Sequence, residues 1–156
     1  MTFQIQALPT ENFAPLFALD DAALTAQNAI RVTAHSDSGY PCRVSLTDVP
    51  AGTELILLNH AHLDIASPYA SRHAIYVSKV AAQATPAPDT VPDMLASRTL
   101  SVRAFDQAGL MADADVVAGD ALSGMLADYF AKPQIAWVDI HSAARGCFLA
   151  RAQPSA

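Results

Sequence analysis

The chain has 156 residues, of which 52% are hydrophobic and only 15% are charged. A chain of this length can bury a core without disulfides or metal, and this composition excludes a disordered protein. The chain has fifteen acidic residues and nine Lys and Arg, so its net charge is −6, and its basic residues form no stripe. This charge distribution excludes nucleic-acid binding by electrostatics. The sequence has no run of about 18 apolar residues and no basic segment opening a signal peptide. We therefore expect a soluble, cytoplasmic protein that neither enters a membrane nor is exported.

The N-terminal third predicts a helical segment followed by strands. Phe13, Leu16 and Phe17 have the i, i+3, i+4 spacing of one helical face, and Asp20 is suited to cap a second short helix. Alternation of apolar and polar residues then predicts strands. These strands span residues 30–34, 42–46 and 54–60, and the last is apolar on both faces, as in the centre of a sheet.

The remaining two thirds predict further strands and one clear helix. A strand at 73–79 precedes a Pro-rich segment, 81–92, that we expect to be a mobile loop. A hairpin should follow over 98–117, and then a helix capped by Asp120 and ended before Pro133. Two strands over 134–151 flank a turn with Gly146, and we expect 152–156 to be a frayed tail.

These elements predict an α+β fold over a single domain, residues 1–156. Hairpin-length connections favour a mainly antiparallel sheet, because parallel neighbours need longer crossovers. The N-terminal helical segment and one amphipathic helix in the C-terminal half would pack on that sheet.

Period-2 alternation sorts the strand residues into an apolar and a polar face. The apolar sets are Cys42, Val44 and Leu46; Leu100, Val102 and Ala104; and Ala136, Val138 and Ile140. The polar sets are Arg43 and Ser45; Ser101 and Arg103; Trp137, Asp139 and His141; and Asp113 and Asp115. The polar face is either the solvated side of one sheet or an anion-binding pocket. In the second case the ligand-binding residues would be Arg43, Arg103, Asp139, Trp137 and His73, with the guanidinium groups gripping a carboxylate or phosphate.

The cysteines and the remaining histidines suggest further chemistry without fixing it. Cys42 should be a buried thiol, whereas Cys147, beside Arg145 and Gly146, is either a packing residue or the nucleophile of a catalytic pair with His141. A metal site would start from His60 and His62, with His73 or His141 as third ligand, but this spacing alone does not predict one. His35 should be solvated. The glycine spacing supports no nucleotide cofactor, and we expect none. The two distant cysteines suit a reducing compartment.

Several segments together resemble the bacterial domain of unknown function 1203 family. They are Gly39-Tyr40-Pro41-Cys42-Arg43-Val44-Ser45-Leu46, Leu57-Leu58-Asn59-His60, Ser67-Pro68-Tyr69, His73-Ala74-Ile75, Arg103-Ala104-Phe105-Asp106, and His141 with Gly146-Cys147. The resemblance runs over essentially the whole chain. It implies a small bacterial single-domain protein and carries no activity, cofactor or catalytic residue. Ser142 stands where it leads us to expect Asn.

Two functional hypotheses therefore stay open. The first is a non-enzymatic domain that binds a small anion or a protein partner, with homodimer formation as one use of an exposed strand edge. The second is an enzyme acting on a small anionic metabolite, with Arg43 and Arg103 as anchors, His141 as acid or base and Cys147 as nucleophile.

Overall fold

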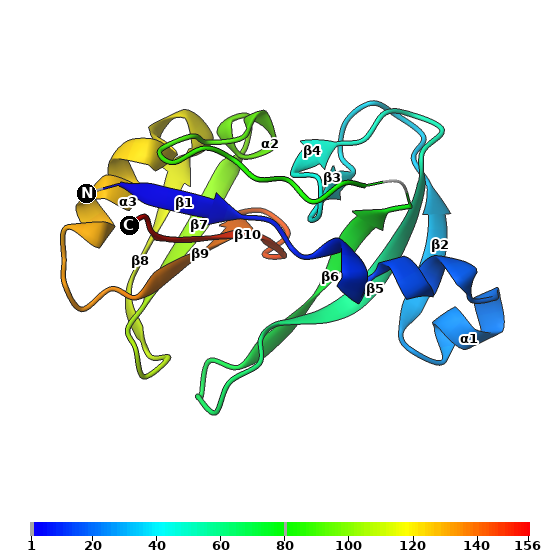
Figure 1. Cartoon of the computed structure of the whole chain (residues 1–156), viewed down its shortest axis with the longest axis horizontal. Coiled ribbons are helices and arrows are strands. Elements are labelled where there is room, and N and C mark those ends of the chain that lie inside the picture. Colours follow the sequence, from blue (N-terminus) through cyan, green and yellow to red (C-terminus); the bar gives the residue numbers. More distant parts are fainter. Residues whose placement is uncertain (1, 80) are drawn as a thin grey trace.

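The computed structural model describes residues 2–79 and 81–156, which form two five-stranded sheets. The sheets lie side by side, one in each half of the view in Figure 1. Sheet A has the order β1 (Phe3–Gln6), β10 (Phe148–Pro154), β9 (Trp137–Ser142), β7 (Thr99–Phe105), β8 (Met111–Ala118). Sheet B has the order β2 (Ala29–Thr33), β5 (Glu54–Leu63), β6 (Ser71–Ser78), β3 (Pro41–Cys42), β4 (Thr47–Asp48).

The helices are short and few. They are the 3₁₀ turns η1 (Thr10–Asn12), η2 (Ala14–Ala18) and η3 (Gly119–Ala121), and the α-helices α1 (Asp21–Thr25), α2 (Asp93–Ala96) and α3 (Leu122–Phe130). The predicted α+β class and the antiparallel pairing are confirmed, with one parallel contact, Cys42 to Tyr76, among the described pairs. The sequence predicted one sheet, and the structure has two. β1 pairs with β10 in sheet A, whereas β2 pairs with β5 in sheet B, so strands that are neighbours in sequence lie in different sheets.

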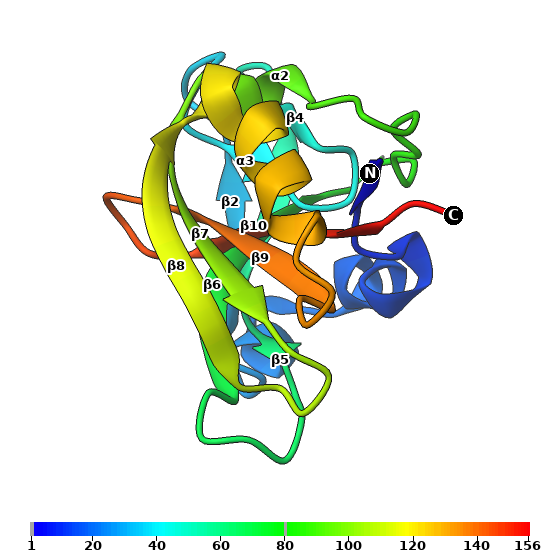
Figure 2. The ribbon, with the colours of Figure 1, turned by 90° about the vertical axis from the view of Figure 1, so that its left-hand side faces the viewer.

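The first core lies between sheet A and α3. In Figure 2, where the sheet A side of the molecule faces the viewer, α3 lies in front of strands of sheet A. Its buried residues Leu122, Leu126 and Phe130 follow the predicted stripe and pack with residues such as Val138 and Ile140 of β9. The apolar face of β9 therefore points at the helix, and its alternate residues point at sheet B.

The second core belongs to sheet B and the N-terminal helical segment. Phe13 and Leu24 pack there with Ile56, Ile75 and other buried residues of the sheet. Asp20 caps α1 as predicted, since its Oδ1 accepts a hydrogen bond of 2.8 Å from the backbone N of Ala23.

Two element predictions are wrong. The strand expected at 42–46 ends at Cys42, and a tight turn with Leu46 at φ +53° replaces the rest. This turn still buries Val44 and Leu46, so their alternation reflected burial and not strand structure. Asp120 caps no helix, because it lies inside η3 and α3 begins after Ala121 without a side-chain cap.

Two segments expected to be loose are hydrogen-bonded. In the loop over 81–92, the backbone N of Asp89 donates to Phe3 O and its Oδ1 accepts from Phe3 N, both at 2.9 Å. The expected frayed tail, 152–156, starts with the end of β10, where Ala152 pairs with Ile5 and Pro154 with Phe3. Sequence alternation does not reveal these contacts, because they join distant segments.

Polar side chains connect the sheets. Arg98, just before β7, donates to both carboxylate oxygens of Asp48 on β4, at 2.6 and 2.8 Å. Arg43 and Arg151 each donate to a backbone carbonyl of the opposite sheet, Phe148 O at 2.8 Å and His62 O at 3.1 Å. Among the helices of the described residues, none is both long and apolar enough to cross a membrane.

Candidate functional site

Three strands of sheet A present a polar ladder towards sheet B. In the β-sheet register, Ser101 on β7 lies opposite His141 on β9, and Arg103 lies opposite Asp139. On the other side of β9, Asp139 faces Arg151 of β10. Arg103, Asp139 and His141 thus share one face of one sheet, as their alternation predicted. The middle of that face is closed to solvent, since Asp139 is 0% and His141 is 1% exposed, whereas Arg103 and Trp137 are partly exposed.

The Asp139 carboxylate is held by Arg151, a residue that the sequence analysis did not single out. Arg151 donates from Nε and Nη2 at 2.6 and 3.0 Å, and its guanidinium lies 5.3 Å from the centre of the Trp137 ring. Burial raises the pKa of Asp139, whereas the hydrogen bond and charge of Arg151 lower it. Counting outward from the turn would not have placed Arg151 opposite Asp139, because a register shift between Phe148 and Ala150 moves the pairing by one residue.

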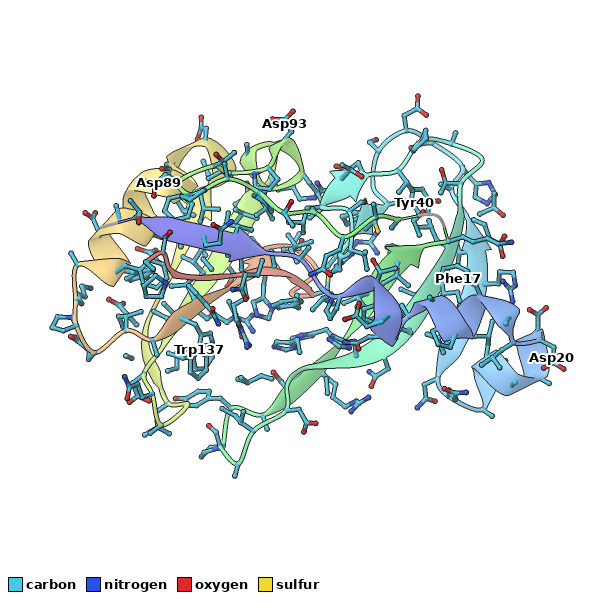
Figure 3. The ribbon with its side chains drawn as sticks, in the orientation of Figure 1. Phe17, Asp20, Tyr40, Asp89, Asp93 and Trp137 are labelled. Atoms are coloured by element: carbon cyan, nitrogen blue, oxygen red, sulfur yellow. The ribbon has the colours of Figure 1, made fainter. Side chains whose placement is uncertain are left out.

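Arg103 and Trp137 lie on the same face of sheet A as Asp139 and His141. Arg103 has one side-chain hydrogen bond, from Nε to Ser101 Oγ at 3.4 Å, and no carboxylate partner within ion-pair distance among the described residues. The Trp137 ring stacks on Phe105 with 5.4 Å between centroids, and its position on β9 can be followed in Figure 3. Its Nε1 is buried and has no hydrogen-bond partner in the described chain.

Arg43 comes from sheet B and not from the face that carries Arg103, which corrects the expected common face. It is only 1% exposed and donates to Pro41 O at 2.6 Å and to Cys147 Sγ at 3.2 Å, besides Phe148 O. No carboxylate pairs with it among the described residues. Burial lowers the pKa of Arg43, and the neighbouring Cys147 raises it. A buried guanidinium nevertheless stays charged, so Arg43 is a cation that lacks a carboxylate counter-ion.

A cavity of about 500 Å³ lies beside Arg43, between the two sheets. Its lining includes Arg98, Arg145, His73, Ser142 and Cys147, and it has no Asp or Glu among the described residues. Arg98 is neutralised by Asp48, whereas Arg145 is exposed and has no ion-pair partner in the described part of the chain. The cavity therefore has excess positive charge in a protein whose net charge is −6.

The predicted catalytic pair is not assembled as a pair. Cys147 Sγ accepts from Arg43, whereas His141 uses Nδ1 for a 2.9 Å hydrogen bond with Gly146 O. No hydrogen bond joins Cys147 and His141 in the described structure. Cys42 is fully buried, as predicted, and both cysteines are free thiols.

The histidines group differently from the predicted pair. His62 lies with His73 of β6 and His141 of β9, and one ligand atom of each lies within 4.8 Å of the others. His60 lies apart, against the edge of the Phe13 ring at 5.5 Å between centroids. A register shift in β5 after His60 separates the two, which their spacing did not reveal. His35 is exposed, as predicted.

The acidic pair of β8 lies outside this site. Asp113 accepts a 2.7 Å ion pair from Lys132, just after α3, so it faces the helix side of sheet A. Its register opposite Ala104, a residue of the first core, explains this placement.

The candidate site residues can be compared with known proteins. Neither the curated proteins nor the solved structures provide a match. A scan against protein families matches residues 39–153 to the family described as protein of unknown function (DUF1203). That range contains Arg43, the histidine cluster, Asp139, Cys147 and Arg151, whereas η1, η2, α1 and β2 lie before it. Because the match spans most of its residues, the chain belongs to the DUF1203 family.

Proposed function

We propose that the protein binds a small anionic metabolite, one with a carboxylate or phosphate group, in the cavity beside Arg43. The observation that carries this proposal is the charge of the lining: Arg43 and Arg145 have no carboxylate partner among the described residues, and the lining has no acid there. Its volume, about 500 Å³, is in the range of small-molecule sites.

The buried guanidinium of Arg43 lacks a compensating negative charge. Removing a cation from water costs several kcal/mol unless an opposite charge or several hydrogen bonds compensate. Arg43 has two carbonyl acceptors and a sulfur, which leaves donor capacity on both terminal nitrogens. An anion in the cavity would supply the missing charge and use those donors. Arg145 at the exposed turn would contact the same anion from the solvent side.

The test compares anion binding to the parent protein with binding to the Arg145→Ala variant. Inorganic phosphate and succinate serve as probes, and isothermal titration and the thermal unfolding midpoint serve as readouts. We expect Arg145→Ala to weaken binding by about tenfold, which corresponds to the loss of one charge-assisted contact of about 1.4 kcal/mol. Arg72→Ala, at an exposed arginine outside this cavity, is the matched control and should bind like the parent protein. Equal affinities in all three proteins, or no saturable binding, would contradict the proposal.

An enzymatic role is the second candidate, and the contact between Arg43 and Cys147 favours it. Arg43 donates to Cys147 Sγ at 3.2 Å, so the sulfur lies beside a fixed cation in the lining of the cavity. Alkylation with iodoacetamide distinguishes the candidates: a nucleophile should react faster than a model thiol at neutral pH, whereas a packing cysteine should react more slowly. Cys147→Ser identifies which of the two thiols reacted.

The free cysteines also support placing this activity in a reducing compartment, the bacterial cytoplasm. Both Cys42 and Cys147 are thiols. Proteins of oxidising compartments generally pair such residues. A thiol assay on protein prepared from native cells without added reductant should find two free thiols per chain.

A further inference from the structure

His62, His73 and His141 meet where the two sheets face each other. They come from the end of β5, from β6 and from β9, and their rings stack or meet edge to face. The centroids are 4.7 Å apart for His62 and His73, 5.0 Å for His62 and His141, and 5.2 Å for His73 and His141. Neither sheet alone holds all three imidazoles.

Two of these rings are oriented by a hydrogen bond on the nitrogen that points away from the cluster. Gly146 O can only accept, so the Nδ1 of His141 carries the proton and its Nε2 presents a lone pair. The Nε2 of His62 lies 3.1 Å from Ser71 Oγ. Histidines that ligate metals are usually held in this way, by a carbonyl or another polar group on the far nitrogen.

The ring nitrogens that point into the cluster cannot all form hydrogen bonds with one another. His62 Nδ1 lies 3.3 Å from His73 Nδ1, so at most one hydrogen bond can form between them. His141 Nε2 is buried and has no partner in the described chain. A stacked aromatic cluster without a ligand would leave that lone pair unpaired at a cost of about 1–3 kcal/mol. A cation bound among the three rings removes this cost.

The distances fit a tetrahedral ion. Zinc–nitrogen bonds of about 2.0–2.1 Å place two ligand nitrogens about 3.3–3.4 Å apart in a tetrahedron. The His62–His73 separation of 3.3 Å already has this value. Since the three ligand atoms lie within 4.8 Å of one another, His141 needs to approach by no more than about 1.5 Å.

The protonation state also suits a metal ion. Burial, together with the neighbouring cationic groups, lowers the pKa of both His62 and His141 to about 3, and burial lowers the pKa of His73 as well. A lowered pKa favours the neutral imidazole, which is the form that binds metal.

We infer that His62, His73 and His141 form a mononuclear Zn²⁺ site, with a fourth coordination position left for water or an exogenous ligand. Three imidazole ligands and one open position are the arrangement of catalytic zinc sites. Arg103 opposes the ion, because its guanidinium is near enough to lower the pKa of all three histidines. Asp139 does not offset this charge, since it is paired with Arg151. The zinc site does not depend on anion binding at Arg43, although His73 also lines that cavity.

The experiment measures Zn²⁺ binding to protein stripped with EDTA, by competition with a chromogenic chelator. We expect one Zn²⁺ per chain, and we expect Co²⁺ to give the intense visible bands of a four-coordinate site. His62→Phe and His73→Phe keep an aromatic ring and remove one ligand. Each should weaken Zn²⁺ binding by at least about 100-fold, because changes to the surrounding hydrogen bonds alone cost 10–100-fold.

Two further variants keep the inference falsifiable. His60→Phe, at the neighbouring histidine of β5 outside the cluster, should bind Zn²⁺ like the parent protein. Arg103→Gln should tighten Zn²⁺ binding, since it removes the opposing charge and leaves the ligands in place. Circular dichroism verifies that each variant is folded. The inference is overturned if the parent protein binds no Zn²⁺ stoichiometrically, or if His60→Phe lowers the affinity as much as His62→Phe does.

Discussion

Acid should destabilise the protein through the buried histidines, and His62 offers the clearest measurement. Its pKa in the native protein is lowered to about 3, with burial as the largest cause. In the unfolded chain the pKa returns to about 6.5. Between these two values the unfolded state binds a proton that the native state does not, so stability falls as the pH decreases from about 6.5 towards 3.

The magnitude follows from the two pKa values. Protonation stabilises the unfolded chain by about 0.2 kcal/mol per histidine at pH 7 and by about 2 kcal/mol at pH 5, whereas the native state gains almost nothing at either pH. His62 should therefore remove about 2 kcal/mol of the free energy of unfolding between pH 7 and pH 5. His141, with its pKa also lowered to about 3, should remove a similar amount.

The assay is urea denaturation at pH 7 and pH 5 in the presence of EDTA, for the parent protein and His62→Phe. Phenylalanine can keep the stacking of position 62 on Phe148, whose ring centroid lies 5.0 Å away. The variant should lose about 2 kcal/mol less between the two pH values than the parent protein does. His35→Phe, at an exposed histidine, controls for the change of residue type. A difference between parent and His62→Phe of less than about 0.5 kcal/mol would refute the reasoning.

Four more predictions concern packing and the connection between the sheets, each measured by urea denaturation. Gly119→Ala should destabilise by roughly 1–3 kcal/mol, because its Cβ would lie 2.0 Å from a backbone oxygen of α2. Gly124→Ala, in α3 with open space at that position, should stabilise by about 0.5–1 kcal/mol, and the opposite sign at either glycine would contradict the packing described. Asp48→Ala and Arg98→Ala, singly and together, should give a coupling energy of about 0.2–1 kcal/mol, since both side chains are partly exposed. Zero coupling would mean that the pair does not help to join the sheets. Leu126→Ala should cost about 2–5 kcal/mol by leaving a cavity under α3, and a loss below 1 kcal/mol would show that the helix packs loosely.

The sequence predicted the faces of individual strands well. Alternation placed Asp139 and His141 on one face of their strand and Arg103 on one face of another, and the register of β7 and β9 brings these faces to the same side. Alternation is a local property of the backbone, so within one strand it needs no knowledge of which strands pair. The stripe of α3 was predicted for the same reason.

The sequence did not predict what covers that face. A polar face was compatible with solvent or with a pocket, and only the second sheet decides between them, by burying Asp139 and His141. The segment after Cys42 shows the same limit. Its alternation was read as a strand, but a turn buries Val44 and also aims Arg43 between the sheets.

The histidine cluster is the part of the site that the sequence predicted least well. His62, His73 and His141 come from three strands, and the first two are brought together by the β5–β6 pairing with its register shift. Sequence spacing favoured His60 with His62, which the structure separates. Long-range pairing of this kind leaves no periodic signal in a single sequence.

The proline-containing loop gives sheet A a protected border. An outer strand such as β1 offers unpaired backbone groups to which the strand of another molecule can add, the first step of many aggregates. Here Asp89 occupies both backbone groups of Phe3, and the Gln4 side chain donates to Pro86 O. Pro86 and Pro88 have no backbone N–H with which to extend the sheet further. The loop thus prevents another strand from adding to the β1 edge of sheet A. Shortening the loop should make the protein prone to self-association before it weakens either core.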